Sequence, residues 1–465
     1  MTPLAAEEEA MSEVTRATIT ASPTRRRWRV GVAPLGWRVG VALLLGWTAL
    51  VAAPHAARAQ VRGLITGPGE TAFPIAVTDL QGGGGEAGRL FGATLTRNLD
   101  LSGLFRVLDP GSFNGGGGGP EDVDFGSWAS MGARLLVTGR ISSGGGDVTV
   151  EARLFDVAER RQLGGKRYSG SSRDVRRMAN RFADEILLQL TGEAGPFDSR
   201  VAFISTRSGR FKELYVMNLD GSDLRQLTRN QTINLSPSWA PDARSLVFTS
   251  FKDGRPKLYE MDVTTGRERL IPTGPGMVMG ASFSPDGREI AVTRGGGKGD
   301  SEIALVTPDG GAISRLTEGQ AINVSPSFSP NGSQIVFCSG RTGSPQIYVM
   351  GTGGGQPRRL TSRGSYNTQP VWSPKGDKIA YTGRVDGRFQ IFVVGADGGE
   401  PTQITSSRGD NVDPTWSPDG RYLIFSSTRA GKAQLYFSDA RGVRQRQLIT
   451  SPGSDSSPAW SSRLE

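Results

Sequence analysis

Histidine and cysteine are almost absent from this sequence of 465 residues, which contains one of each, His55 and Cys338. A Ser-His-Asp triad and a histidine zinc site both need histidine, and a disulfide or a thiolate metal site needs more than one cysteine. Cys338 follows the apolar residues 335–337, so we expect an inert thiol in a buried strand. We therefore predict no catalytic residue, no metal site and no cofactor.

Charge of one sign is also scarce outside the N-terminus. The formal net charge is +9, and residues 1–59 hold seven Arg and four Glu, which leaves +6 for the rest, from 47 basic and 41 acidic residues. No tract of Lys and Arg follows, so we predict an ordinary surface and no nucleic-acid partner. The glycine clusters 82–85 and 115–119 lack the Lys-Ser or Lys-Thr of a phosphate-binding loop and indicate flexible loops.

The one long apolar run lies near the N-terminus. Arg25–Arg29 and Arg38 precede the run Val39–Ala53, and the small-x-small site 57–59 follows it, which is the pattern of a secretory signal peptide. The alternative, a membrane anchor, needs about 20 apolar residues, and this run has about 15. We predict a signal peptide over 1–59, a mature chain that starts at Gln60 and contains no His, and export to the periplasm. The pair Arg25-Arg26 leaves a twin-arginine route open beside the general one.

Residues 60–195 predict a small α/β domain. Apolar residues recur at helical spacing in 87–101 and 175–190, and Gly103 and Gly192 stop these two helices. A short helix is expected over 125–131. Strands are expected at 73–77 and 105–108, as a hairpin of 135–141 with 147–156, and as a free or edge strand over 61–66.

Residues 200–465 contain a repeat of 44 or 45 residues. Each copy centres on an aromatic residue in a phrase such as Pro-Ser-Trp-Ala-Pro-Asp, at Trp239, Phe283, Phe328, Trp372, Trp416 and Trp460. A period of about 40–45 residues built from short strands is typical of a β-propeller blade. Each repeat resolves into four strands, A to D, and the aromatic residue ends strand A.

The two ends of the array predict how the ring closes. Before the first aromatic residue, 201–204, 214–217 and 224–227 already supply strands B, C and D, and only five residues follow Trp460. The C-terminal strand A should therefore complete the sheet that begins at Val201. We predict a closed all-β six-bladed β-propeller with no open blade edge. The six aromatic residues are then structural.

The tight turns after strand A explain the recurring aspartates. Asp242, Asp286 and Asp419 lie in Pro-Asp turns, where a side chain that caps backbone N–H groups is the expected role, with catalysis as the alternative. Ala243 stands where the other turns of this type have Gly. If this position needs a positive φ, Ala costs on the order of 1 kcal/mol, and Ala243→Gly should raise the melting temperature.

A second polar position recurs three residues before the Pro of strand A. It is occupied by Asn234, Asn323, Asn367, Asn411 and Asp455, with Val278 in the remaining repeat. One reading is that these side chains shape the loop that enters strand A. The other is that they ring one mouth of the central channel and face a protein or peptide ligand, or line a channel that holds a hydrated cation.

The whole of 60–465 resembles the TolB family, on the signal peptide, the small α/β domain and six Trp/Phe-Ser-Pro-Asp-Gly repeats that close on Pro-Ala-Trp-Ser at 458–461. The resemblance implies a monomeric, non-enzymatic periplasmic protein of the Tol–Pal system. Such a protein lies peripheral to membranes and supports outer-membrane invagination at cell division and envelope integrity. It implies binding to the lipoprotein Pal through the propeller mouth, here Asn234, Met277, Met279, Gly280, Asn323, Val324, Asn367, Thr368 and Asn411.

The same resemblance implies binding to the inner-membrane protein TolA, beside other Tol–Pal components, through the extended mature N-terminus. That segment is Gln60, Val61, Arg62, Gly63, Leu64, Ile65, Thr66 and Gly67. An extended segment can add a strand to a partner's sheet. Two alternatives stay open. A secreted propeller enzyme, a glycan lyase or glycosidase, requires a carboxylate pair in the channel about 5–10 Å apart. A carbohydrate-binding propeller should expose aromatic side chains at one mouth.

Overall fold

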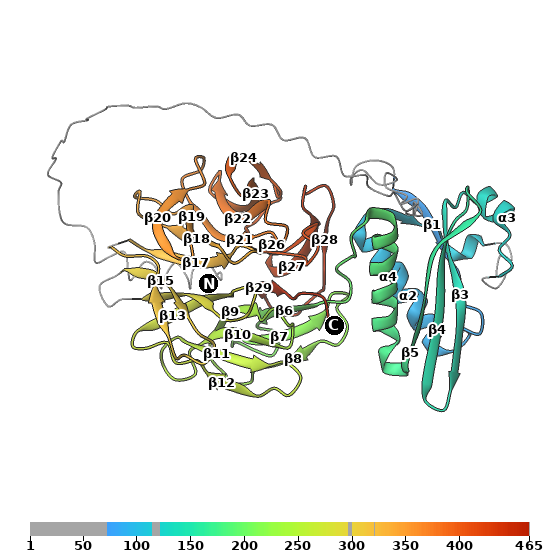
Figure 1. Ribbon diagram of the computed structural model, residues 1–465, viewed down its shortest axis with the longest axis horizontal. Coiled ribbons are helices and arrows are strands. Elements are labelled where there is room, and N and C mark those ends of the chain that lie inside the picture. The colour runs from blue at the N-terminus through green and yellow to red at the C-terminus, as the bar shows by residue number, and fades with distance from the viewer. Residues whose placement is uncertain (1–71, 114–120, 296–299, 320, 465) are drawn as a thin grey trace, which may run out of the picture.

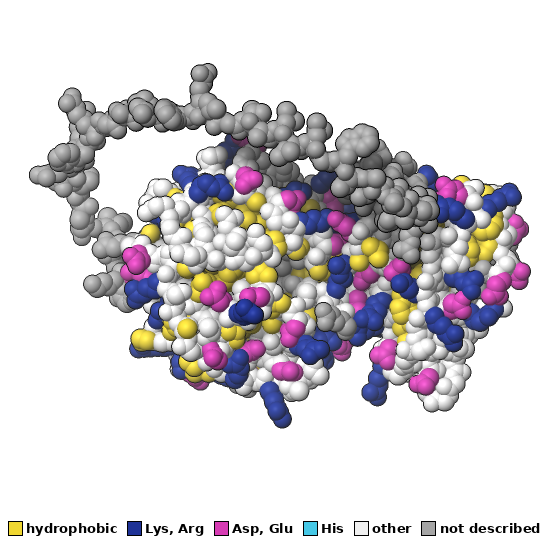
Figure 2. All heavy atoms as spheres, in the orientation of Figure 1, with side chains coloured by type: hydrophobic (Ala, Val, Ile, Leu, Met, Phe, Trp, Pro, Cys, Tyr) yellow, Lys and Arg dark blue, Asp and Glu magenta, His cyan; other side chains and the backbone are white. Residues whose placement is uncertain are grey.

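The computed structural model describes residues 72–113, 121–295, 300–319 and 321–464, and the expected signal peptide and mature N-terminal segment lie outside these ranges. An α/β domain lies beside a six-bladed propeller (Figure 1). On the face drawn in Figure 2, Lys and Arg side chains are interspersed with Asp and Glu side chains over both parts. None of the helices formed by the described residues is both long and apolar enough to span a membrane.

The α/β domain is a five-stranded sheet in the order β2-β1-β3-β4-β5. One face packs against α2 and α4, with Leu95 and Phe182 fully buried between the layers, and the other face carries α3 with buried Trp128. The expected helices and strands are present, and the structure adds one strand, β5, that the sequence did not predict. The bounds are β1 Phe73–Val77, α2 Glu86–Ser102, β2 Phe105–Val107, α3 Phe125–Ser130, β3 Leu135–Gly144, β4 Asp147–Asp156, β5 Arg161–Ser171 and α4 Val175–Thr191, with single 3-10 turns at Pro110–Ser112 and Ser172–Asp174.

The propeller consists of six antiparallel sheets of four strands each, with β29 beside β6. We number the blades from this closing sheet, so blade 1 is β29-β6-β7-β8. The strands are β6 Arg200–Ser205, β7 Glu213–Asn218, β8 Arg225–Gln226, β9 Asn234–Trp239, β10 Ser245–Ser250, β11 Lys257–Asp262, β12 Glu268–Leu270, β13 Met277–Phe283, β14 Ile290–Gly295, β15 Ser301–Val306, β16 Ile313–Arg315, β17 Asn323–Phe328, β18 Gln334–Ser339, β19 Gln346–Gly351, β20 Gly354–Arg359, β21 Asn367–Trp372, β22 Lys378–Val385, β23 Arg388–Gly395, β24 Gly398–Gln403, β25 Asn411–Trp416, β26 Tyr422–Ala430, β27 Lys432–Asp439, β28 Gln445–Gln447 and β29 Asp455–Trp460.

The predicted closure is confirmed. The C-terminal strand β29 pairs antiparallel with β6, with Trp460 opposite Val201 and Asp455 opposite Ser205. The ring therefore joins residues more than 250 positions apart without covalent help, and no blade keeps a free inner edge.

The aromatic residues of strand A join neighbouring blades. The indole N–H of Trp416 donates to the Val371 carbonyl at 3.1 Å, and that of Trp239 donates to the Ala459 carbonyl at 3.0 Å. Each bond runs from one A strand to the next, and the rings are buried. This satisfies the polar N–H of a large buried side chain and supports the structural role expected for these residues.

The turns after strand A have the expected chemistry. The side chains of Asp242, Asp286 and Asp419 each accept a hydrogen bond from the backbone N–H two residues later, at 2.9, 3.1 and 3.2 Å. Ala243 has a φ of 55°, in the left-handed region, as do the glycines that occupy this position in other blades, for example Gly287 at 71°. Turn capping thus accounts for the recurring aspartates.

The two parts of the molecule share one hydrophobic core. Residues of α2 and α4 pack in a single cluster with Val201 and Phe203 of blade 1, with Tyr422 and Phe437 of blade 6, and with Trp460. The Tyr422 hydroxyl donates to the Ser102 carbonyl at 3.1 Å. The domain therefore covers the outer side of blades 1 and 6 (Figure 1).

Candidate functional site

The propeller has two unlike faces. At one, which we call the loop face, strand B ends beside the start of strand A, as Ser250 lies opposite Asn234. The B-to-C and D-to-A connections bond to one another there, for example Phe251 N to Ile233 O at 3.0 Å and Thr428 N to Asp410 O at 2.9 Å. The loop face comprises residues 206–212, 251–257, 294–300, 340–345, 384–388 and 428–432 together with 227–233, 271–276, 316–322, 360–366, 404–410 and 448–454.

The opposite, or turn, face holds the A-to-B and C-to-D connections. They also bond to one another, as in Val263 N to Arg244 O at 3.0 Å and Ala440 N to Arg421 O at 2.9 Å. The turn face comprises residues 240–244, 284–289, 329–333, 373–377, 417–421 and 461–464 together with 218–225, 262–268, 307–312, 351–354, 395–398 and 439–445.

The recurring Asn and Asp side chains lie at the loop face, but they are buried rather than presented to a ligand. Asn411 and Asn367 each donate at 2.9 Å to the glutamine that begins strand C, Gln390 and Gln346. The exposed fraction of the five polar residues is at most 2%. The prediction that these side chains ring a mouth and face a partner is therefore wrong for the side chains, because each one satisfies polar groups inside its own blade. The alternative, that they shape the entry loop, is confirmed.

Sequence reasoning missed the partner of this Asn, a cation just after strand B. Arg429 donates to the Asn411 carbonyl oxygen at 2.8 Å and lies 4.2 Å from the centre of the Tyr436 ring. Arg341 repeats the arrangement with Asn323 at 3.0 Å. Burial lowers the pKa of both arginines from its usual value, and both remain charged. The overlooked signal is a basic residue at the same position of all six repeats, namely Arg207, Lys252, Arg294, Arg341, Arg384 and Arg429.

Blade 3 lacks this arrangement. Val278 replaces the Asn and is 1% exposed, and strands B and C of this blade carry no aromatic pair. Arg294 instead donates to the Pro275 carbonyl at 3.2 Å, and its Nε is buried without a partner among the described residues. The apolar residue and the altered arginine therefore occur together, which supports a coupled structural unit.

The other predicted mouth residues divide by exposure. Met277 is 41% exposed at the start of β13, and Met279, Gly280 and Val324 are partly buried. Thr368 is buried. Met277 is therefore the one predicted side chain with large apolar area open to solvent, and Ile233, 40% exposed at the same face, is a neighbour in kind that the sequence did not single out.

The central channel contains a ring of residues in the left-handed conformation. One residue in each strand A has a φ between 48° and 57°, at a position where the pairing with strand B shifts register. Such bulges aim side chains out of the regular pleat. The six residues line a channel of about 480 Å³ and are Ser236, Gly280, Ser325, Gln369, Asp413 and Ser457.

Asp413 is the one carboxylate in the channel lining formed by described residues. It accepts hydrogen bonds from Ser457 N at 3.2 Å and Ser457 Oγ at 3.3 Å, and from the Gln369 amide. Burial raises its pKa, since desolvation of the carboxylate outweighs these bonds. The carboxylate pair that would favour a glycosidase is not present in this lining, and the described residues contain no group of three or more metal-ligating side chains.

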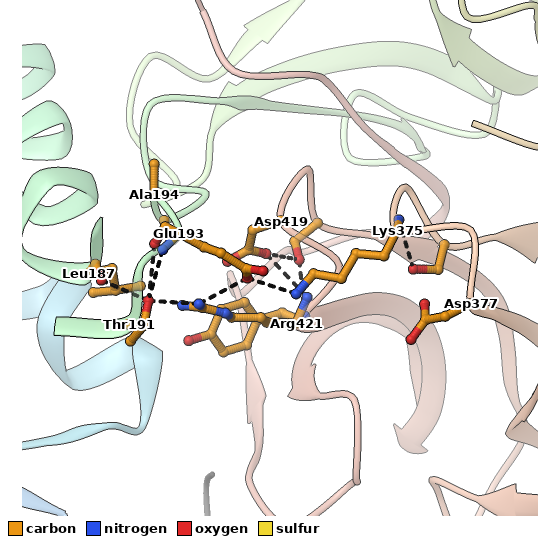
Figure 3. Close-up of polar contacts among 12 residues, drawn as sticks. Leu187, Thr191, Glu193, Ala194, Lys375, Asp377, Asp419 and Arg421 are labelled. Carbon is orange, nitrogen blue, oxygen red and sulfur yellow. Dashed lines mark hydrogen bonds and ion pairs between the residues drawn. The ribbon is translucent and has the colours of Figure 1, made fainter. Parts of the chain in front are cut away.

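The turn face meets the α/β domain at a polar junction (Figure 3). Glu193 lies just after α4 and accepts hydrogen bonds from Lys375 at 2.7 Å and from Arg421 at 3.0 Å. Arg421 also donates to Thr191 Oγ1 at 2.7 Å. These two cations lower the pKa of Glu193, with the Lys375 hydrogen bond as the main cause. They come from the turns of blades 5 and 6, so two A strands connect the channel lining to this junction.

The segment between α4 and β6 is also held by its backbone. Asp184 of α4 accepts hydrogen bonds from Phe197 N at 2.8 Å and Asp198 N at 3.0 Å. Burial raises the pKa of Asp184 to about 7, against the lowering effect of these two bonds. Arg463 near the C-terminus donates to the Ala194 carbonyl at 2.8 Å. The linker thus has fixed contacts on both sides.

Comparison with known proteins agrees with this architecture. The family model for the TolB beta propeller domain matches residues 188–464, and that for the TolB amino-terminal domain matches residues 63–163. A protein TolB homolog of Chlorobium luteolum is 36% identical over 321 residues, which cover 66% of this chain and 71% of the relative. The Tol-Pal system protein TolB of Desulfosudis oleivorans is 41% identical over 196 residues, 42% of this chain and 44% of that protein.

Among solved structures, the crystal structure of TolB from Acinetobacter baumannii has both parts of the fold. It matches with a TM-score of 0.76 and 26% identity, and the match covers 84% of this chain and 97% of the other. The similarity therefore extends over the α/β domain and the propeller together.

Proposed function

The chain belongs to the TolB family, and on that premise we propose that it is a periplasmic coupling component of a Tol–Pal system. In this proposal the propeller binds the lipoprotein Pal at the loop face, and the mature N-terminus, residues 60–67, binds TolA. The protein lies peripheral to the membranes as a monomer and supports outer-membrane invagination at division and envelope integrity. The work it does is binding, without a catalytic step or a cofactor.

One observation carries the placement of Pal at the loop face. Met277 and Ile233 expose large apolar side chains there, at 41% and 40% of their area, beside an open channel. Protein interfaces combine such an apolar centre with a polar rim. The turn face is less available, because the linker and Glu193 occupy the turns of blades 5 and 6.

The buried Asn residues have an indirect role in this proposal. Asn323 and Asn411 hold the arginines that follow strand B, so they set the shape of the surface that Pal meets. Of the residues that the family resemblance points to, we therefore assign direct contact to Met277, Met279 and Val324 and a supporting role to Asn234, Asn323, Asn367, Thr368 and Asn411. Gly280 lines the channel.

A matched pair of variants tests the placement. Isothermal titration calorimetry of the mature chain, residues 60–465, with the soluble domain of Pal from the same cell should give a measurable Kd. Met277→Asp should weaken binding about tenfold, which corresponds to about 1.4 kcal/mol. Leu270→Asp changes an equally exposed apolar residue, 43% exposed in the outer strand β12, and should leave the Kd unchanged. Equal effects of the two substitutions would reject the loop face as the Pal site.

A further inference from the structure

Charge divides between the two faces of the propeller. The described residues of the loop face include 15 Arg and Lys against five Asp and Glu, whereas those of the turn face include nine Arg and Lys against 12 Asp and Glu. The net charge of the chain is modest because the two faces offset one another. The expectation of an evenly mixed surface, drawn from the total charge, therefore misses a strong local asymmetry.

Several loop-face cations are not used inside the protein. Arg255, Arg388 and Arg408 are exposed, and their side chains form no ion pair with any other described residue. They come from the B-to-C loops of blades 2 and 5 and from the D-to-A connection between blades 5 and 6, so they lie around the channel rather than in one cluster. Unpaired like charges around one opening repel each other, and they raise the local concentration of anionic groups near the surface.

A second set of cations at the same face is held rigidly. Arg341 and Arg429 lie over aromatic rings of their own blades, and each is fixed by an Asn carbonyl oxygen. Arg207 is fixed in the same way by Asp455 at 2.8 Å. Fixed guanidinium groups lose little side-chain entropy when a partner binds, which favours preorganised recognition of carboxylates.

We infer that the loop face receives an acidic protein surface, whose Asp and Glu side chains meet the ring of loop-face cations while apolar side chains cover Met277 and Ile233. The pairing of an apolar centre with a cationic rim favours a protein over a lipid surface, since a flat membrane would meet the rim charges and leave the recessed channel unfilled. This inference rests on the proposed function for the identity of the partner, Pal. It adds that association is electrostatically steered and falls with ionic strength.

The test compares two triple variants of the mature chain. The loop-face variant carries Arg255→Gln, Arg388→Gln and Arg408→Gln. The control carries Arg244→Gln, Arg267→Gln and Arg288→Gln, which removes the same charge from exposed positions of the turn face. Association rates with Pal and with a decaglutamate peptide are measured at about 50 and 300 mM salt. Circular dichroism melts show that both variants are folded.

We expect the loop-face variant to associate with Pal about tenfold more slowly at low salt and to lose most of the salt dependence, while the control stays within about twofold of the parent. The decaglutamate peptide should bind the parent and the control but not the loop-face variant. Tight Pal binding that ignores both salt and the loop-face charges would overturn the inference and leave the proposed function standing.

The remaining outcomes also decide between the two proposals. Loss of peptide binding in the loop-face variant alone, with no Pal binding by the parent, would support the acidic-partner inference and reject Pal as the partner. Capture of the parent on phosphatidylglycerol vesicles, without binding to Pal or to the peptide, would overturn the inference in favour of a membrane surface.

Discussion

The loop face and the turn face of the propeller are made by the same strands, yet they differ in chemistry. The turn face ends each strand A in a tight Pro-containing turn whose capping side chains bond locally, and it meets the linker through Glu193. The loop face begins each strand A with a buried polar residue and carries unpaired arginines outside it. The comparison teaches that one end of the repeat is used for attachment within the chain and the other is open for a partner.

The largest expected effect concerns the ring that keeps the two faces apart. Deleting residues 458–465 removes the part of β29 that pairs with Val201 and Ala202, together with buried Trp460. Loss of a buried Trp alone costs about 3–5 kcal/mol, so we expect at least that decrease in the free energy of unfolding, measured by urea denaturation. Deleting only Leu464 and Glu465 is the control. An unchanged midpoint in the longer truncation would show that the C-terminal strand does not close the ring.

Replacing one polar residue at each face should separate buried from exposed roles. Asn411→Ala leaves Arg429 and Gln390 without a partner inside blade 6 and should lower the free energy of unfolding by about 2–3 kcal/mol. Asn331→Ala at the turn face removes an exposed bond to Ser333 N and should cost about 0.5–1 kcal/mol. Equal losses in thermal denaturation would contradict the buried role assigned to the loop-face Asn.

The junction with the α/β domain should respond weakly. Glu193→Gln removes the charge that pairs with Lys375 and Arg421, but all three side chains are partly exposed, so we expect a loss of at most about 1 kcal/mol. The readout is the rate of proteolysis in the linker 192–199, which should increase. Glu400→Gln, which breaks the exposed pair with Arg363, should leave that rate unchanged. Faster cleavage in both variants would indicate a general effect of charge.

The smallest expected effect is a gain at the turn face. Ala243 has a left-handed backbone at a φ of 55°, so Ala243→Gly should relieve strain of about 0.5–1 kcal/mol, reduced by the loss of a buried methyl group. The melting temperature should rise. A fall would mean that packing of the methyl group outweighs the strain.

The sequence predicted the fold well because the repeat leaves little freedom. Six aromatic residues at intervals of 44 or 45 fix the number of blades, and the start of the array at strand B requires the closure seen between β29 and β6. Strand β5 was missed because Arg161–Ser171 contains three glycines and no alternating apolar pattern. It joins the sheet through backbone bonds to β4.

The site was predicted less well. The positions of the Asn residues were found, but a recurring polar residue looks the same in a sequence whether it faces solvent or a buried Gln. Arg429 and its equivalents carry the missing information, since a cation at the same place in every repeat implies a partner for it. The charge asymmetry was hidden because the total charge adds two faces that differ in sign.

The account stands on one claim above the others, that Pal binds at the loop face. Hydrogen exchange of the mature chain, measured by mass spectrometry with and without Pal, tests this claim without any substitution. We predict slower exchange in the loop-face segments around 251–257, 271–279 and 384–388, with the turn-face segments 284–289 and 329–333 unchanged. Protection confined to the turn face, or to the α/β domain, would contradict the account.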